Sequence, residues 1–155
     1  MDSSIVPLGQ KTKKTMNTYD SQPPQSTPSG EFAFVTGFRY LAGKAHSNSE
    51  DKGFWKILET VRALPNKADA AELESLYLQS RLALMHSELS EALTGIRKGL
   101  MDDHLPHRSM EVAELADTII RIMDYAAGFD LPVAEVVLEK MAYNRGRPYK
   151  HGDVT

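Results

Sequence analysis

LMHSELSEALTGIRKG, residues 84–99, and ELADTIIRIMDYA, residues 114–126, decide how this chain folds. Each stretch holds an acidic residue followed three positions later by another, and 22 residues separate the two pairs. Residues three apart share one face of a helix and lie one turn from each other. Two such helices packed antiparallel would direct all four carboxylates at one point. The four acidic residues are Glu88, Glu91, Glu114 and Asp117.

A cluster of unpaired carboxylates repels itself and therefore calls for a divalent cation. Oxygen ligands alone indicate Mg²⁺ or Mn²⁺, whereas a di-iron bundle needs Glu-x-x-His motifs that this chain lacks. The competing interpretation is a solvated helix face, which is what most such acid pairs mark. Apolar neighbours on both stretches favour a position at the border of the core. Asp124, seven residues after Asp117, could extend the acidic line.

Apolar residues at helical spacing continue on both sides of these two stretches and predict an all-α domain. On the first long helix they fall at 78, 82, 85, 89, 93 and 96, and we expect them to face the core. Asp69 is the expected N-cap of that helix, and Gly99 its expected end. The expected helices cover about 54–64, 69–98, 109–128 and 132–144.

The rest of the chain divides by composition. Residues 1–30 are polar and rich in proline, so they predict a flexible arm. Residues 31–52 combine apolar residues with Gly37 and Gly43, which favours a short strand or an irregular extension. The helical domain is then expected over 53–152.

Composition excludes several classes of protein. The net charge of −3 does not favour broad binding to nucleic acid, and the absence of cysteine rules out disulfides and thiolate metal sites. No apolar run is long enough to span a bilayer, and the N-terminus lacks the apolar segment of a signal peptide. We therefore expect a cytoplasmic protein that binds neither membrane nor nucleic acid.

A basic run near the C-terminus forms the second candidate constellation, because arginine and amide donors suit phosphate oxygens. Its alternative is solvated surface. No Walker A motif or Gly-x-Gly-x-x-Gly is present, so a P-loop or Rossmann enzyme is not favoured. Trp55 is the only tryptophan; it either packs in the core or forms a stacking wall for a base. The members of the basic run are Lys140, Asn144, Arg145, Arg147, Tyr149, Lys150 and His151.

The two acidic stretches, together with EKMAYNRGRPYKHG at 139–152, resemble the MazG-like family of all-α nucleotide pyrophosphohydrolases. The similarity covers about 54–152 and is strongest to the short, single-domain members found in bacteria and phages. It implies a four-helix-type bundle completed by association into a homodimer or homotetramer. It also implies hydrolysis of a nucleoside triphosphate to the monophosphate and pyrophosphate, which would control a nucleotide pool.

The resemblance further implies a division of labour among the residues. Glu88, Glu91, Glu114 and Asp117 would hold Mg²⁺ or Mn²⁺, and Glu88 or Glu91 would be the general base. Among substrates it favours a purine triphosphate, (d)GTP. The alternatives are a phosphoribosyl-ATP type of pyrophosphohydrolase and a non-catalytic helical dimer acting as an adaptor. The substrate contacts would come from Lys140, Asn144, Arg147, Tyr149 and Lys150. Trp55 joins these candidates only as the stacking wall raised above, which does not follow from the resemblance.

Overall fold

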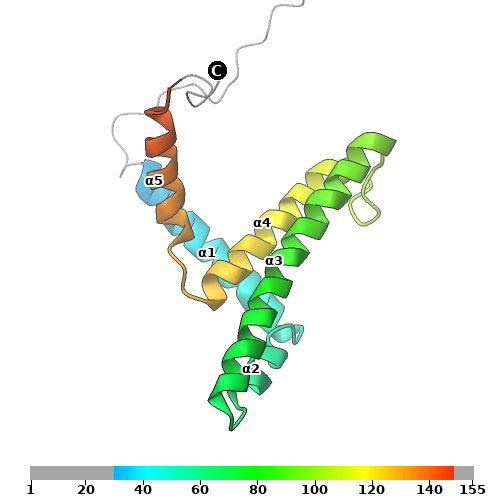
Figure 1. Cartoon of the computed structure of the whole chain (residues 1–155). Helices are drawn as coiled ribbons and strands as arrows, with labels where there is room; N and C mark the ends of the chain where they lie inside the picture. The colour runs from blue at the N-terminus through cyan, green and yellow to red at the C-terminus, as the bar shows by residue number, and fades with distance from the viewer. Residues whose placement is uncertain (1–29, 149–155) are drawn as a thin grey trace, which may run out of the picture.

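The computed structural model describes residues 30–148, and the predicted all-α class is confirmed in that part of the chain (Figure 1). The only extended pairing there is an isolated antiparallel bridge between Met101 and Ser109. None of its helices combines the length and the apolar character that crossing a bilayer requires. The helices are α1 (Gly30–Asp51), α2 (Lys56–Arg62), α3 (Lys67–Lys98), α4 (Met110–Gly128) and α5 (Val133–Arg145).

The two long central helices, α3 and α4, run side by side and form the largest contact in the molecule. Gly99 ends α3 in the left-handed conformation, as the sequence predicted, with φ of 62°. The bridge at Met101 then returns the chain to the start of α4. Close to this turn the two helices approach each other tightly at Gly95. A Cβ at this position would lie only 2.9 Å from the Cβ of Met110.

Helix α3 begins earlier than predicted. Its N-cap is Asn66, whose side chain accepts a hydrogen bond of 3.0 Å from the backbone N–H of Ala68. Asp69 lies instead in the first turn, where its charge suits the positive end of the helix dipole. Asparagine and aspartate cap about equally well, so composition alone could not choose between these neighbouring positions.

The expectation of an irregular segment over residues 31–52 is wrong, because this segment is the regular helix α1, which packs across α4. Gly37 and Gly43 do not break it: a Cβ at either would meet nothing within 4 Å, so both lie on an open side. The helical body therefore begins at α1, not at residue 53. The expected flexible arm lies almost wholly outside the described residues. The less exposed positions of α1 recur every three or four residues, at Val35, Phe38, Ala42, Ala45 and Ser49.

A small aromatic core joins the N-terminal half of α3 to α2, to the residue before α2, and to the end of α4. Trp55, 6% exposed, packs with Leu58 and Tyr77, and Phe129 lies against them. Its ring also passes so close to Gly128 that a Cβ there would lie 2.1 Å from it. The structure thus places Trp55 in the core, which is the packing alternative raised by the sequence.

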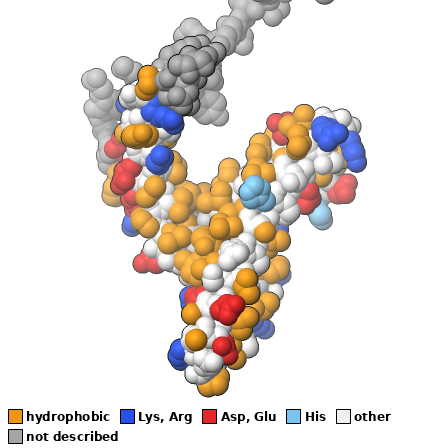
Figure 2. Space-filling view, in the orientation of Figure 1, with side chains coloured by type: hydrophobic (Ala, Val, Ile, Leu, Met, Phe, Trp, Pro, Cys, Tyr) orange, Lys and Arg blue, Asp and Glu red, His pale blue; other side chains and the backbone are white. Residues whose placement is uncertain are grey.

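The apolar stripe of α3 that was expected to be buried is largely exposed. Leu82, Leu89, Leu93 and Ile96 are exposed, and the face that contacts α4 carries Arg81, Glu88, Ala92 and Gly95 instead. On α4, Val112, Leu115 and Ile119 are exposed as well. Figure 2 shows apolar side chains gathered at the centre of the view, between α5 and the pair formed by α3 and α4. Within residues 30–148, the protein thus presents long apolar helix faces that no other described helix covers.

Candidate metal centre and adjoining cavity

Three of the four predicted carboxylates meet between the central helices. Glu88 and Glu91 come from α3 and Glu114 from α4, and one oxygen from each lies within 4.8 Å of the others. Glu88 and Glu114 are 6% and 8% exposed, whereas Glu91 faces solvent. The antiparallel return of α4 therefore brings three of the four predicted carboxylates together, while Asp117 is not among them.

The electrostatics of the cluster are those of crowded negative charge. Burial, a hydrogen bond with Glu88 and the charges of Glu91, Glu88 and Asp117 raise the pKa of Glu114 from its ordinary 4.5 to about 7. Near neutral pH, Glu114 therefore holds a proton in part of the molecules. A cation placed between these oxygens would remove the cause of that shift.

Asp117, the fourth predicted ligand, lies one turn further along α4 and is exposed. It does not belong to the group of three oxygens. Partial burial and the charge of Glu88 nevertheless raise its pKa, while the positive charges of Arg121 and His104 oppose that rise. The negative charge of the cluster therefore acts on Asp117 as well, although Asp117 lies at its edge. His104, from the loop between the central helices, is electrostatically close to it.

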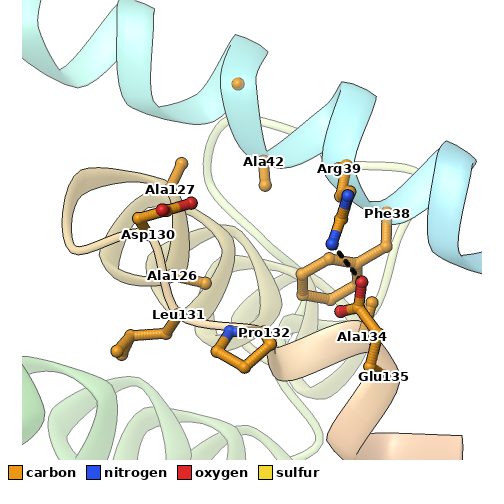
Figure 3. A pocket seen from close by; sticks show the side chains of 11 residues that line it. Phe38, Arg39, Ala42, Ala126, Ala127, Asp130, Leu131, Pro132, Ala134 and Glu135 are labelled. Atoms are coloured by element: carbon orange, nitrogen blue, oxygen red, sulfur yellow. Dashed lines mark hydrogen bonds and ion pairs between the residues drawn. The ribbon is translucent and has the colours of Figure 1, made fainter.

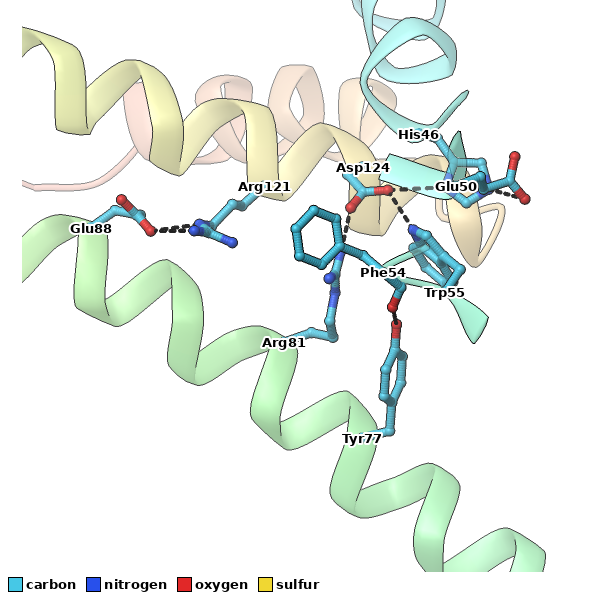
Figure 4. Close-up of polar contacts among 9 residues, drawn as sticks. All are labelled: His46, Glu50, Phe54, Trp55, Tyr77, Arg81, Glu88, Arg121 and Asp124. Atoms are coloured by element: carbon cyan, nitrogen blue, oxygen red, sulfur yellow. Dashed lines mark hydrogen bonds and ion pairs between the residues drawn. The ribbon is translucent and has the colours of Figure 1, made fainter. Parts of the chain in front are cut away.

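One cation already contacts the cluster. The Nε and Nη2 atoms of Arg121 lie 2.6 Å from the Oε1 atom of Glu88 (Figure 4). Sequence reasoning missed this residue, although the signal was present. Arg121 follows Glu114 by seven positions and Asp117 by four, so all three share one face of α4.

The buried carboxylate Asp124 continues the same face of α4 and connects four segments of the fold. It accepts a hydrogen bond of 2.9 Å from the Nε1–H of Trp55, lies 2.9 Å from the Nδ1 atom of His46 on α1, and pairs with Arg81 of α3. The guanidinium of Arg81 also lies over the ring of Trp55, 5.2 Å from its centroid. Asp124 therefore extends the acidic line, as the sequence indicated, but it is fully engaged by partners.

A cavity of about 210 Å³ lies between this buried carboxylate and the cluster. Asp117 and Arg121 border it on the cluster side, and Arg81 and Asp124 on the other. Helix α1 contributes amide and hydroxyl groups from Asn48 and Ser49. A small cavity with both charge signs in its wall therefore adjoins the carboxylates.

A larger cavity, of about 500 Å³, lies on another side of α1 and contains none of the predicted site residues (Figure 3). Small and apolar side chains make up most of its wall, and the ion pair between Arg39 and Glu135 spans from α1 to α5.

The members of the C-terminal basic run that the structure describes are not brought to the cluster of the same chain. Lys140 and Asn144 are exposed on α5. This helix packs against α1, and Figure 1 shows it well apart from the turn that joins α3 to α4. The Nζ atom of Lys140 lies 4.8 Å from the ring centroid of Tyr143. Arg147 follows the helix and is exposed, and the two remaining predicted contacts, Tyr149 and Lys150, lie outside the described residues.

Comparisons of the chain with protein-family models, with curated proteins and with solved structures gave no match. The resemblance to the MazG-like family thus stays a prediction from three sequence motifs. Function is argued below from the residues and their geometry.

Proposed function

We propose that the protein is a metal-dependent hydrolase that converts a (deoxy)nucleoside triphosphate to its monophosphate and pyrophosphate. The observation that carries this proposal is the convergence of Glu88, Glu91 and Glu114, with one oxygen of each within 4.8 Å of the others. Acidic clusters also occur without any cation. The burial of two of these side chains and the raised pKa of Glu114 favour a site that becomes stable once positive charge is added.

The residues present fit Mg²⁺ or Mn²⁺. The donor set consists of carboxylate oxygens alone, and the exposed side of Glu91 leaves room for water and substrate oxygens, which Mg²⁺ usually retains. Asp117, one turn away, would be the fourth protein ligand. When bound, such a cation lowers the pKa of a coordinated water and neutralises charge on phosphate oxygens.

The chain's own carboxylates then divide the remaining work. Hydrolysis joins a water oxygen to phosphorus, breaks the α–β bridging bond, and requires a base for the proton of that water. Glu91 is the best candidate for the base, because it is exposed and makes no ion pair or side-chain hydrogen bond among the described contacts. Glu88, in contrast, is buried and engaged by Arg121.

We further propose that a second copy of the chain completes the site, in a homodimer or homotetramer. Two observations support this. The apolar faces of α3 and α4 are exposed in one copy. Lys140 and Asn144 lie on α5 and Arg147 just after it, and α5 is remote from the carboxylate cluster of the same chain. Helix α5 of a second copy could bring those donors to the phosphates of the substrate. The substrate we favour is (d)GTP, by resemblance only.

Pyrophosphate release tests the proposal. The purified full chain is incubated with a panel of ribo- and deoxyribonucleoside triphosphates in Mg²⁺, in Mn²⁺ and in EDTA, and the nucleotide product is identified. The proposal expects monophosphate and pyrophosphate in equal amounts, only when the metal is present. Folded protein that binds metal but turns over no triphosphate would contradict it and would favour a non-catalytic adaptor.

A further inference from the structure

The contact between Arg121 and Glu88 places a guanidinium where the proposed metal needs a carboxylate. Both Nε and Nη2 lie 2.6 Å from Oε1 of Glu88, which is one of the three converging side chains. Arg121 therefore neutralises part of the cluster in the absence of a metal. A divalent cation and this guanidinium cannot both use the same oxygen at full strength, because two positive charges would then lie side by side.

Arg121 differs from the other arginine of the cavity in how firmly it is held. Arg81 has a side chain only 9% exposed, pairs with the buried Asp124 and lies over two aromatic rings. The side chain of Arg121 is 38% exposed, and Glu88 is its one ion-pair partner among the described residues. If Glu88 turns to a metal, no other ion pair among the described residues keeps the Arg121 guanidinium in place.

The free space next to Arg121 is the cavity of about 210 Å³ already described, which Arg121 borders together with Asp117. A guanidinium that leaves Glu88 can turn into this space without crossing a packed layer. It would then lie beside the carboxylates, within reach of a ligand held there. Phosphate oxygens match its fork of N–H donors with two parallel bonds.

We propose that Arg121 is a displaceable counter-ion of the carboxylate cluster, which binding of a divalent cation releases to grip a phosphate group of the substrate. This inference rests on the proposed function. Metal and triphosphate would then strengthen each other's binding, because the metal frees the residue that the triphosphate needs. Arg121 also opposes metal binding when no substrate is present, which keeps the empty enzyme weakly loaded.

Calorimetric titration with Mn²⁺ alone, at pH 8, separates this role from a structural one. Arg121→Gln removes the competing cation and keeps a polar side chain, and Arg121→Lys keeps the charge without the fork. Arg62→Gln is a matched control, because Arg62 grips Glu74 through the same Nε and Nη2 atoms, at 3.0 and 2.6 Å, on a surface distant from the cluster. Each variant is first shown to be folded by circular dichroism.

We expect Arg121→Gln to bind Mn²⁺ about two- to fivefold more tightly than the wild type, the range of one partly exposed ion pair. At saturating Mn²⁺ the same variant should bind a non-hydrolysable triphosphate about tenfold or more weakly. Arg121→Lys should fall between, and it decides the matter if Arg121→Gln does not fold. Arg62→Gln should match the wild type in both titrations.

The contrary outcomes are distinct. If the wild type binds Mn²⁺ but Arg121→Gln binds it equally or more weakly, Arg121 is not a competitor and this inference fails, while the proposed metal centre stands. Unchanged triphosphate binding by Arg121→Gln would remove the phosphate contact. If the wild type binds no Mn²⁺ at all, the proposed function fails and this inference fails with it.

Discussion

Replacing Glu114 by glutamine should stabilise the metal-free protein at alkaline pH and leave it almost unchanged at acid pH. The pKa of Glu114 is raised from 4.5 to about 7 in the folded protein. Between these two values the folded state holds a proton that the unfolded chain releases. The free energy of unfolding therefore falls as the pH rises through that window, and the full cost is present above pH 7.

The size of the effect follows from the same two values. Each pH unit between them is worth about 1.4 kcal/mol, and they are about 2.5 units apart, which sets a ceiling of about 3.5 kcal/mol. Glutamine resembles the protonated acid: it is neutral, and its amide N–H can donate to Glu88. We expect Glu114→Gln to unfold with a free energy about 1–3 kcal/mol higher at pH 8, and within about 0.5 kcal/mol of the wild type at pH 4.5.

Urea unfolding followed by circular dichroism, in EDTA and at one fixed protein concentration, measures both values. Glu72→Gln is the control, because Glu72 is exposed on the same helix as Glu88 and lies away from the cluster. It should change stability by no more than about 0.5 kcal/mol at either pH. A Glu114→Gln variant no more stable than the wild type at pH 8 would refute the argument that the charge of Glu114 destabilises the folded protein.

Three further predictions concern the fold and the cation. Asp124→Asn should lower the free energy of unfolding by about 3–5 kcal/mol, because it leaves Arg81 buried without its charge partner; chemical denaturation measures this. Gly128→Ala should cost about 1–3 kcal/mol or more, since its Cβ would collide with the ring of Trp55, whereas Gly43→Ala should be neutral or stabilising by up to about 1 kcal/mol. Mn²⁺ at about a hundred times its Kd should raise Tm by about 5–10 °C at pH 8 and by less at pH 5, where protons compete for the carboxylates; a thermal shift that is equal at both pH values would contradict this.

The part of the site that sequence predicted correctly depends on the helix period. Residues three apart must share a face, and one short loop allows only an antiparallel return, so Glu88, Glu91 and Glu114 could be placed together in advance. The same period did not tell which face of α3 turns toward α4. The apolar stripe through Leu82 and Leu89 was expected to be buried, yet the polar face meets α4.

The parts that sequence missed depend on tertiary choices. Helix α1 contains two glycines in its interior, Gly37 and Gly43, which lower helix propensity by about 1 kcal/mol each, and its packing across α4 compensates for that cost. The pairing of Arg121 with Glu88 required knowing which of several acids its flexible side chain would reach. In the homo-oligomer that we propose, the position of Lys140 relative to the carboxylates would depend on a second chain, and the pattern of one chain does not contain it.

The most direct test of the central claim is Mn²⁺-dependent pyrophosphate release from dGTP by three proteins: the wild type, Glu91→Gln and Glu72→Gln. Glu91 belongs to the converging carboxylates, and Glu72 is an exposed glutamate of the same helix. The account predicts that Glu72→Gln matches the wild type and that Glu91→Gln, still folded, is slower by about a hundredfold or more. Equal rates for Glu91→Gln and the wild type would contradict the account, as would the absence of pyrophosphate from all three.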